Sequence, residues 1–94
     1  MGYSKQEYKF VKFVKSKNPK KKYDAILQNK KTKREVRVPF GQIGYEQYND
    51  KTGLGLYSKY DHKDKKRRDS YRARHKNDNL NEYSPGFFSW RFLW

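Results

Sequence analysis

The residues of this sequence that can do chemistry are mostly cations, and many of them gather between positions 63 and 76. This block holds eight Lys and Arg against two Asp. Such a row suits contacts with phosphate, which need positive charge but no particular base sequence. Arginine can also grip a phosphate or a carboxylate with paired donors. We predict that the polyanion-binding residues of this block are Lys65, Lys66, Arg67, Arg68, Arg72 and Arg74.

Two other interpretations of this block stay open. The cations could form a solvated helix face that aids solubility, although eight cations exceed what solubility requires. Residues 65–68 also match a nuclear import signal, which is a weak indication in so basic a chain.

A second basic block surrounds an Asn18-Pro19 pair, which favours a turn. Lys20, Lys21 and Lys22 follow directly, and further lysines lie on both sides. We expect these three lysines to form a basic patch at a hairpin tip. The patch could contact a polyanion or a membrane surface, or it could protect an exposed turn and strand edge.

Composition limits the kind of protein this can be. The chain has 94 residues, 24 Lys and Arg, 10 Asp and Glu, and a net charge of +14. A chain of this length forms at most one small domain with a thin core, so an enzyme with its own deep pocket is not expected. The charge favours a larger, acidic partner.

Groups typical of enzymes are sparse. There is no Cys, and His62 and His75 are the two histidines. Ser70 has no neighbouring base, and residues 53–55 lack the spacing and the Lys of a phosphate-cradling loop. We predict no catalytic residue, no metal site, no cofactor and no small-molecule substrate. The sequence also contains no apolar run that could span a membrane and no signal peptide.

The first forty residues predict an antiparallel three-strand meander. Residues 8–16 are rich in Phe and Val, as strands are, although part of this stretch also fits a helical stripe. Residues 23–28 form the second expected strand. Residues 34–40 alternate between apolar and polar side chains, and Pro39 indicates that this strand lies at an edge or ends there.

The remaining residues predict a loop and two helical segments. Residues 41–60 are a Gly- and Tyr-rich loop, residues 61–76 a basic helix with Asp61 as its N-cap, and residues 84–94 an aromatic tail, helix or turn, that starts with Ser84-Pro85. The fold class is therefore α+β, in one domain over residues 1–94. The loop tyrosines could stack on bases, but core packing is the better use for them in a chain poor in Leu.

The tail carries six large apolar side chains in nine residues. As a helix it would be apolar nearly all round and buried on more than one side. Because so small a body covers such a segment with difficulty, we predict that part of it docks into a partner. The predicted partner-docking residues are Phe87, Phe88, Trp90, Phe92 and Trp94.

Three stretches together resemble a known family: Val38-Pro39-Phe40-Gly41, the segment from Asp61 to His75, and Gly86-Phe87-Phe88-Ser89-Trp90. The resemblance is to small basic proteins encoded by large double-stranded DNA viruses, the giant viruses and the viruses of algae. It implies a viral context, but the family has no settled activity and supplies no mechanism. Family members often continue past the final Trp, and many have a shorter loop at residues 41–60.

Two functional hypotheses follow. In the first, the chain is a non-enzymatic structural component of the virus particle, of the minor capsid or cementing type. It would lie in the virion or the infected host cell, dock into larger viral structural proteins, and pair its basic faces with acidic protein or packaged DNA. In the second, it is an accessory protein that binds DNA or RNA without sequence preference, through the basic helix and the hairpin lysines.

Overall fold

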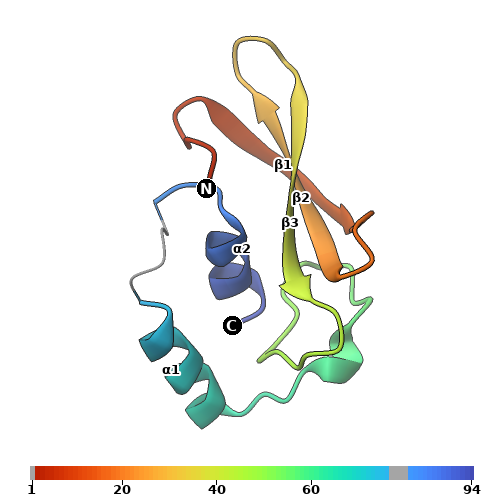
Figure 1. Cartoon of the computed structure of the whole chain (residues 1–94), viewed down its shortest axis with the longest axis vertical. Helices are drawn as coiled ribbons and strands as arrows, with labels where there is room; N and C mark the ends of the chain where they lie inside the picture. Colours follow the sequence, from red (N-terminus) through yellow and green to blue (C-terminus); the bar gives the residue numbers. More distant parts are fainter. Residues whose placement is uncertain (1, 77–80) are drawn as a thin grey trace.

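A computed structural model, which describes residues 2–76 and 81–94, has three strands followed by two helices (Figure 1). The expected α+β fold is therefore confirmed. The elements are β1 (Tyr8–Lys15), β2 (Lys21–Asn29), β3 (Glu35–Gln42), a 3-10 turn η1 (Ser58–Tyr60), α1 (Lys65–Arg74) and α2 (Pro85–Phe92).

The sheet is an antiparallel meander in the order β1-β2-β3. Ala25 pairs with Phe13 on one side and with Val38 on the other, which sets three apolar side chains on one face. Val11 interrupts the register of β1 and is largely exposed, as expected at a bulge. Pro39 lies in the edge strand β3, as predicted.

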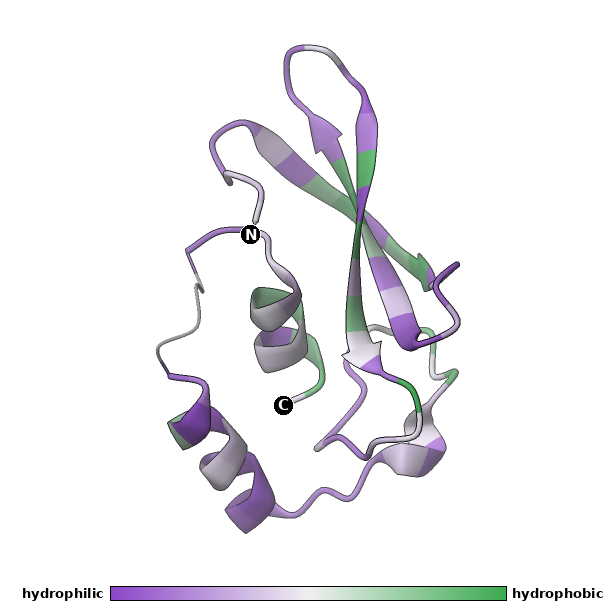
Figure 2. Cartoon of the chain, viewed as in Figure 1, coloured by the Kyte–Doolittle hydropathy of each residue, from purple (hydrophilic) through white to green (hydrophobic). Residues whose placement is uncertain are grey.

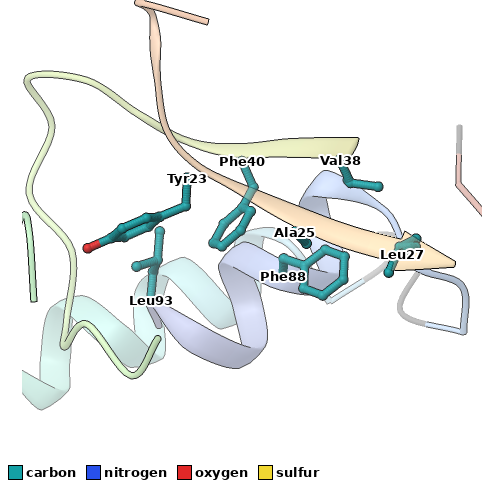
Figure 3. Close-up of a cluster of buried hydrophobic side chains, with 7 residues drawn as sticks. All are labelled: Tyr23, Ala25, Leu27, Val38, Phe40, Phe88 and Leu93. Atoms are coloured by element: carbon teal, nitrogen blue, oxygen red, sulfur yellow. The ribbon is translucent and has the colours of Figure 1, made fainter. Parts of the chain in front are cut away.

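The core lies between this face of the sheet and α2 (Figure 3). Phe88 of α2 is buried against Phe40 of β3, with ring centroids 5.5 Å apart. Phe13 contributes a ring from β1, 5.9 Å from that of Phe88. Aromatic rings thus replace the aliphatic side chains that the sequence lacks, and each buries a large area. The fully buried apolar cluster is Tyr23, Ala25, Leu27, Val38, Phe40, Phe88 and Leu93.

Each helix starts at a residue whose side chain accepts from backbone amides, and one of these two caps was predicted correctly. Ser84 Oγ accepts a hydrogen bond of 3.1 Å from the amide of Phe87, and Pro85 is the first helical residue of α2, both as predicted. The predicted cap of α1 is wrong, because Asp64 caps this helix and accepts from the amide of Lys66 at 3.0 Å. Asp61 instead accepts from the Gln47 side chain at 2.8 Å, inside the protein. The helix therefore begins at Lys65 rather than near residue 61.

Residues 43–64 are an ordered strap rather than an open loop. The amide of Tyr48 donates to the carbonyl of Leu93 at 3.0 Å, and the amide of Lys51 donates to the carbonyl of Phe92 at 2.8 Å. Further along, the amide of His62 donates to the carbonyl of Gln47 at 2.9 Å. The strap is thereby fixed to the end of α2, and it carries the chain to α1. Within the described residues, no helix is long and apolar enough to cross a membrane.

Candidate polyanion-binding surface

The predicted cations of α1 divide into two groups. The first group, Lys65, Lys66 and Arg74, is exposed, and its side chains make no hydrogen bond or ion pair with any residue that the structure describes. These three side chains are therefore free to meet an external anion.

The second group, Arg67, Arg68 and Arg72, contacts the protein itself. Arg67 Nη1 donates to Glu46 Oε1 at 3.0 Å. The Arg68 guanidinium lies 4.8 Å from the centre of the Tyr48 ring and 3.6 Å from Asp69 Oδ1. The contacts with Glu46 and Tyr48 hold α1 to the strap, so the two arginines serve attachment as well as charge.

Arg72 is the most constrained cation of α1. Its Nη2 donates to the carbonyl of Trp94 at 3.0 Å, and its guanidinium lies 5.3 Å from the centre of the Trp90 ring. A side chain held in this way can contribute positive potential but cannot reorient freely toward a partner. It also links α1 to the C-terminal end of α2.

The three hairpin lysines have three different environments. Lys20 is exposed in the turn, whereas Lys21 is half-buried at the start of β2. Lys22 is 1% exposed, and its Nζ donates to Gln47 Oε1 and to the carbonyl of Tyr45 at 2.5 Å. The prediction that Lys22 binds a polyanion is wrong, since its ammonium is used inside the protein. The sequence predicted a turn here, but β2 begins at Lys21 and turns the Lys22 side chain toward the strap.

Burial has an electrostatic consequence for Lys22. Desolvation lowers the pKa of its ammonium, while the charges of Asp50 and Asp61 oppose this shift. Lys22 is thus a structural cation that ties the strap to β2, and a charged residue of this kind must keep its acceptors.

Six of the exposed lysines lie in pairs at three separate corners of the protein. The β1–β2 turn carries Lys17 and Lys20, the β2–β3 turn carries Lys31 and Lys33, and α1 carries Lys65 and Lys66. Figure 1 shows these segments at the right, the top and the lower left, and Figure 2 colours most of the two turns purple, while α1 is purple with a paler middle and a green stretch. The extents of the fold are 42 × 27 × 20 Å, so the three corners surround a thin body.

A cleft connects two of these corners. A cavity of about 500 Å³ lies between α1, α2 and the end of β3. Its lining includes Lys21, Arg67 and Arg74. Among the lining residues that the structure describes, Glu46 is the acidic one, and it is paired with Arg67. Positive charge therefore continues from α1 across the cleft to the base of the β1–β2 turn.

The aromatic tail serves mainly its own fold. Phe88 is 1% exposed, so the prediction that it docks into a partner is wrong. Phe92 packs 4.7 Å from Phe13, and Phe87 lies beneath Lys5 Nζ at 4.1 Å. Half-buried Trp94 stacks on Tyr71 of α1 at 4.2 Å, with ring planes 5° apart. Together with Trp90 beneath Arg72, these rings cover more than one side of α2, as the apolar pattern predicted.

The loop tyrosines follow the expected core packing only in part. Tyr57 packs against Tyr23 at 5.3 Å, and Tyr60 lies near the Lys22 ammonium. Tyr48 lies beneath Arg68. Tyr45 is 63% exposed and is the exception. Three of the four rings are thus occupied within the protein and do not form a stacking platform.

Two cations that lie near α1 were not among the predicted polyanion-binding residues. Lys51 belongs to the nearly neutral middle of the chain, and Arg91 belongs to the nearly neutral tail. Both line a second, smaller cavity together with Arg72. No signal in the sequence brings these three segments together, because the strap and the end of α2 meet through backbone hydrogen bonds.

Comparison with known proteins adds one match. A family of unknown function (DUF5754) matches residues 11–51, which cover the sheet and the start of the strap but neither helix. No curated protein and no solved structure matches the chain.

Proposed function

We propose that this chain is a non-enzymatic protein that binds the phosphate backbone of nucleic acid without reading base sequence. The main observation behind the proposal is the excess of positive over negative side chains. All 24 Lys and Arg lie in the described residues, and three of them form ion pairs with carboxylates there. A chain with a net charge of +14 attracts polyanions at long range.

The aromatic residues support backbone contact over base stacking. Proteins that hold single strands usually offer open aromatic faces to the bases. Here most rings pack against the sheet, against each other or beneath cations. We therefore expect duplex DNA to bind at least as tightly as a single strand of equal length.

One version of the virion hypothesis agrees with this proposal. Burial of Phe88 and the internal contacts of the other tail rings weaken the argument for docking into a larger capsid subunit. The resemblance to proteins of large DNA viruses still suggests a viral setting, in which the packaged genome would be the polyanion. An accessory role in the infected cell would use the same surface.

The decisive experiment measures affinity for random-sequence duplex DNA across a salt series. About six phosphate contacts predict a roughly thousandfold loss of affinity between 50 and 200 mM salt. Three double variants each remove two positive charges, one pair from each corner: Lys17→Gln with Lys20→Gln, Lys31→Gln with Lys33→Gln, and Lys65→Gln with Lys66→Gln. A pair that contacts phosphate should lower the log–log salt slope by about 1.8.

The matched control is Lys9→Gln with Lys12→Gln on exposed positions of β1, which changes net charge equally. We expect this control to keep the wild-type slope more closely than the corner variants do. Weak binding with a flat salt dependence would overturn the proposal. Equal slopes for all four variants would show that net charge alone, and not the three corners, determines binding.

A further inference from the structure

The smaller cavity brings together three cations from three segments. It has a volume of about 310 Å³ and is lined by Lys51 of the strap, Arg72 of α1, and Trp90, Arg91 and Phe92 of α2. None of these lining residues is acidic. This composition is unusual for a cavity in a folded protein, because close like charges repel each other.

Contacts with rings and with the main chain position two of these cations. The Arg72 guanidinium lies over the Trp90 ring and donates to the main-chain oxygen of Trp94, while its Nε is buried and has no partner within residues 2–76 and 81–94. The backbone of Lys51 is fixed by its hydrogen bond to the carbonyl of Phe92, and its Nζ lies 5.8 Å from the centre of the Tyr48 ring. Aromatic faces therefore help to orient the Arg72 and Lys51 side chains.

The positive potential affects Lys51 directly. The pKa of its ammonium is lowered, first by burial and then by the charges of Arg72, Arg68 and Arg91. In the described residues, no Asp or Glu side chain forms an ion pair with Lys51, Arg72 or Arg91. An anion in the cavity would relieve this repulsion, and Trp90 and Phe92 would partly shield it from water.

We propose that this cavity is a phosphate-binding site, in which Lys51, Arg72 and Arg91 surround one phosphate group. The Arg91 guanidinium can donate in pairs to phosphate oxygens, the constrained Arg72 guanidinium adds positive potential, and the Lys51 ammonium adds a compact charge. A phosphate group is strongly charged and offers several acceptor oxygens, so it suits a cluster of three cations. The inference deepens the proposed function and rests on it for the source of the phosphate, which can be a backbone diester, a terminal monoester or free inorganic phosphate.

The test is a titration of the full chain with inorganic phosphate at constant ionic strength, in which chloride makes up the balance. The indole N–H of Trp90 is followed by NMR because this ring lines the cavity. The site variant is Lys51→Gln with Arg91→Gln, since both side chains are largely exposed and their replacement should leave the core intact. The matched control is Lys9→Gln with Lys12→Gln, which removes the same charge from exposed positions of β1.

We expect a saturable shift of the Trp90 signal in the wild type and the control, and at least tenfold weaker binding in the site variant. A drift that does not saturate in any of the proteins would overturn the proposal. So would equal weakening in both variants, because a general loss of charge would then explain the effect. Thermal unfolding of each variant confirms that the fold is retained.

Competition with an oligonucleotide identifies the source of the phosphate. An oligothymidylate that carries a 5′-phosphate should displace inorganic phosphate more effectively than the same strand without it if the site takes a terminal monoester. Equal displacement indicates a backbone diester, and no displacement indicates free phosphate. Duplex binding that persists without a saturable phosphate site would refute this inference alone, whereas saturable phosphate binding without duplex binding would refute the proposed function alone.

Discussion

Phe88 of α2 is enclosed by the rings of β1 and β3, whereas α1 contains no buried residue and is attached by guanidinium and ring contacts. In Figure 1, α2 is drawn between the sheet and α1. The contacts of α1 include those of Tyr71 with Trp94, of Arg68 with Tyr48, and of Arg72 with Trp90 and the main-chain oxygen of Trp94. Arg67 adds an ion pair with Glu46. The two helices therefore depend on different forces, although they follow one another in the chain.

Because of this difference, one part of the protein supplies most of the stability and another part carries exposed positive charge. Burial of apolar area supplies most of the folding free energy, and α2 with the sheet provides it. Exposed cation–ring contacts contribute about 0.5–1 kcal/mol each, so α1 is held by a few modest terms. A helix with this attachment can keep Lys65, Lys66 and Arg74 exposed to water. It should also open locally before the rest of the protein unfolds.

The largest effect should follow from a change in the core. Phe88→Ala removes a fully buried ring and leaves a cavity between α2 and β3, so we expect a loss of about 3–5 kcal/mol in the free energy of unfolding. Urea denaturation followed by circular dichroism measures this loss. Phe87→Ala is the control, because Phe87 is only half-buried and should cost clearly less. Equal costs would contradict the assignment of Phe88 to the core.

Gln47 should be the next most sensitive position, since it links the strap to the sheet. It accepts from the Lys22 ammonium and donates to Asp61 and to the carbonyl of Tyr57 at 2.8 and 2.9 Å. Gln47→Ala leaves a buried charge short of an acceptor, and we expect a cost of about 2–4 kcal/mol. Gln28→Ala removes an exposed amide that bonds one backbone carbonyl, and it should change stability little. Comparable unfolding midpoints for the two variants would argue against the buried network.

Tyr23 adds a pH-dependent effect to the same network. Its hydroxyl donates to Asp50 Oδ2 and accepts from the amide of Leu56 at 3.1 Å, so Tyr23→Phe should cost about 1–2 kcal/mol at neutral pH. Burial, aided by the hydrogen bond to Asp50, raises the pKa of the Tyr23 hydroxyl to about 12 from its ordinary value of 10.0. The unfolded chain therefore loses this proton first.

Because the unfolded chain loses the Tyr23 proton at lower pH than the folded chain does, high pH lowers the stability that Tyr23 contributes. Below pH 10 the hydroxyl is protonated in both states, and the contribution of Tyr23 is complete. Between about pH 10 and pH 12 ionisation favours the unfolded state, so this contribution declines. The stability difference between the wild type and Tyr23→Phe should accordingly shrink over this interval. Ionisation of Lys22 is common to both proteins and cancels. A difference that stays constant up to pH 12 would contradict the raised pKa.

The sequence predicted those parts of the fold that depend on local pattern. Alternation in residues 34–40 identified the inward face of β3, and Ser84-Pro85 identified the start of α2. Asp61 was misassigned because two acidic residues precede α1 and both suit a cap by type. Asp61 is not the cap because its carboxylate accepts a hydrogen bond from the side chain of Gln47, which lies 14 positions earlier in the chain.

The site could be predicted less completely than the fold, for a related reason. Exposure of Lys65 and Lys66 follows from a helix with few apolar residues. Lys21 is half-buried and Lys22 is buried, and this difference depends on which face of β2 the strap covers. The charge of the neighbouring residues does not reveal that face. The cluster of Lys51, Arg72 and Arg91 arises from three distant segments and has no counterpart in the charge of any one of them.

The smallest effect should come from Trp94, and it tests the contrast between the helices most directly. Trp94→Ala removes the ring that stacks on Tyr71, and we expect α1 to lose about 1 kcal/mol of local stability. Hydrogen exchange of the α1 amides should then become roughly fivefold faster, while the amides of β2 keep their protection. Tyr45→Ala, which removes an exposed ring of the strap, should leave both sets unchanged. Faster exchange in β2 as well would mean that α1 and the core unfold together, so that the ring contacts of α1 belong to the same cooperative unit as Phe88.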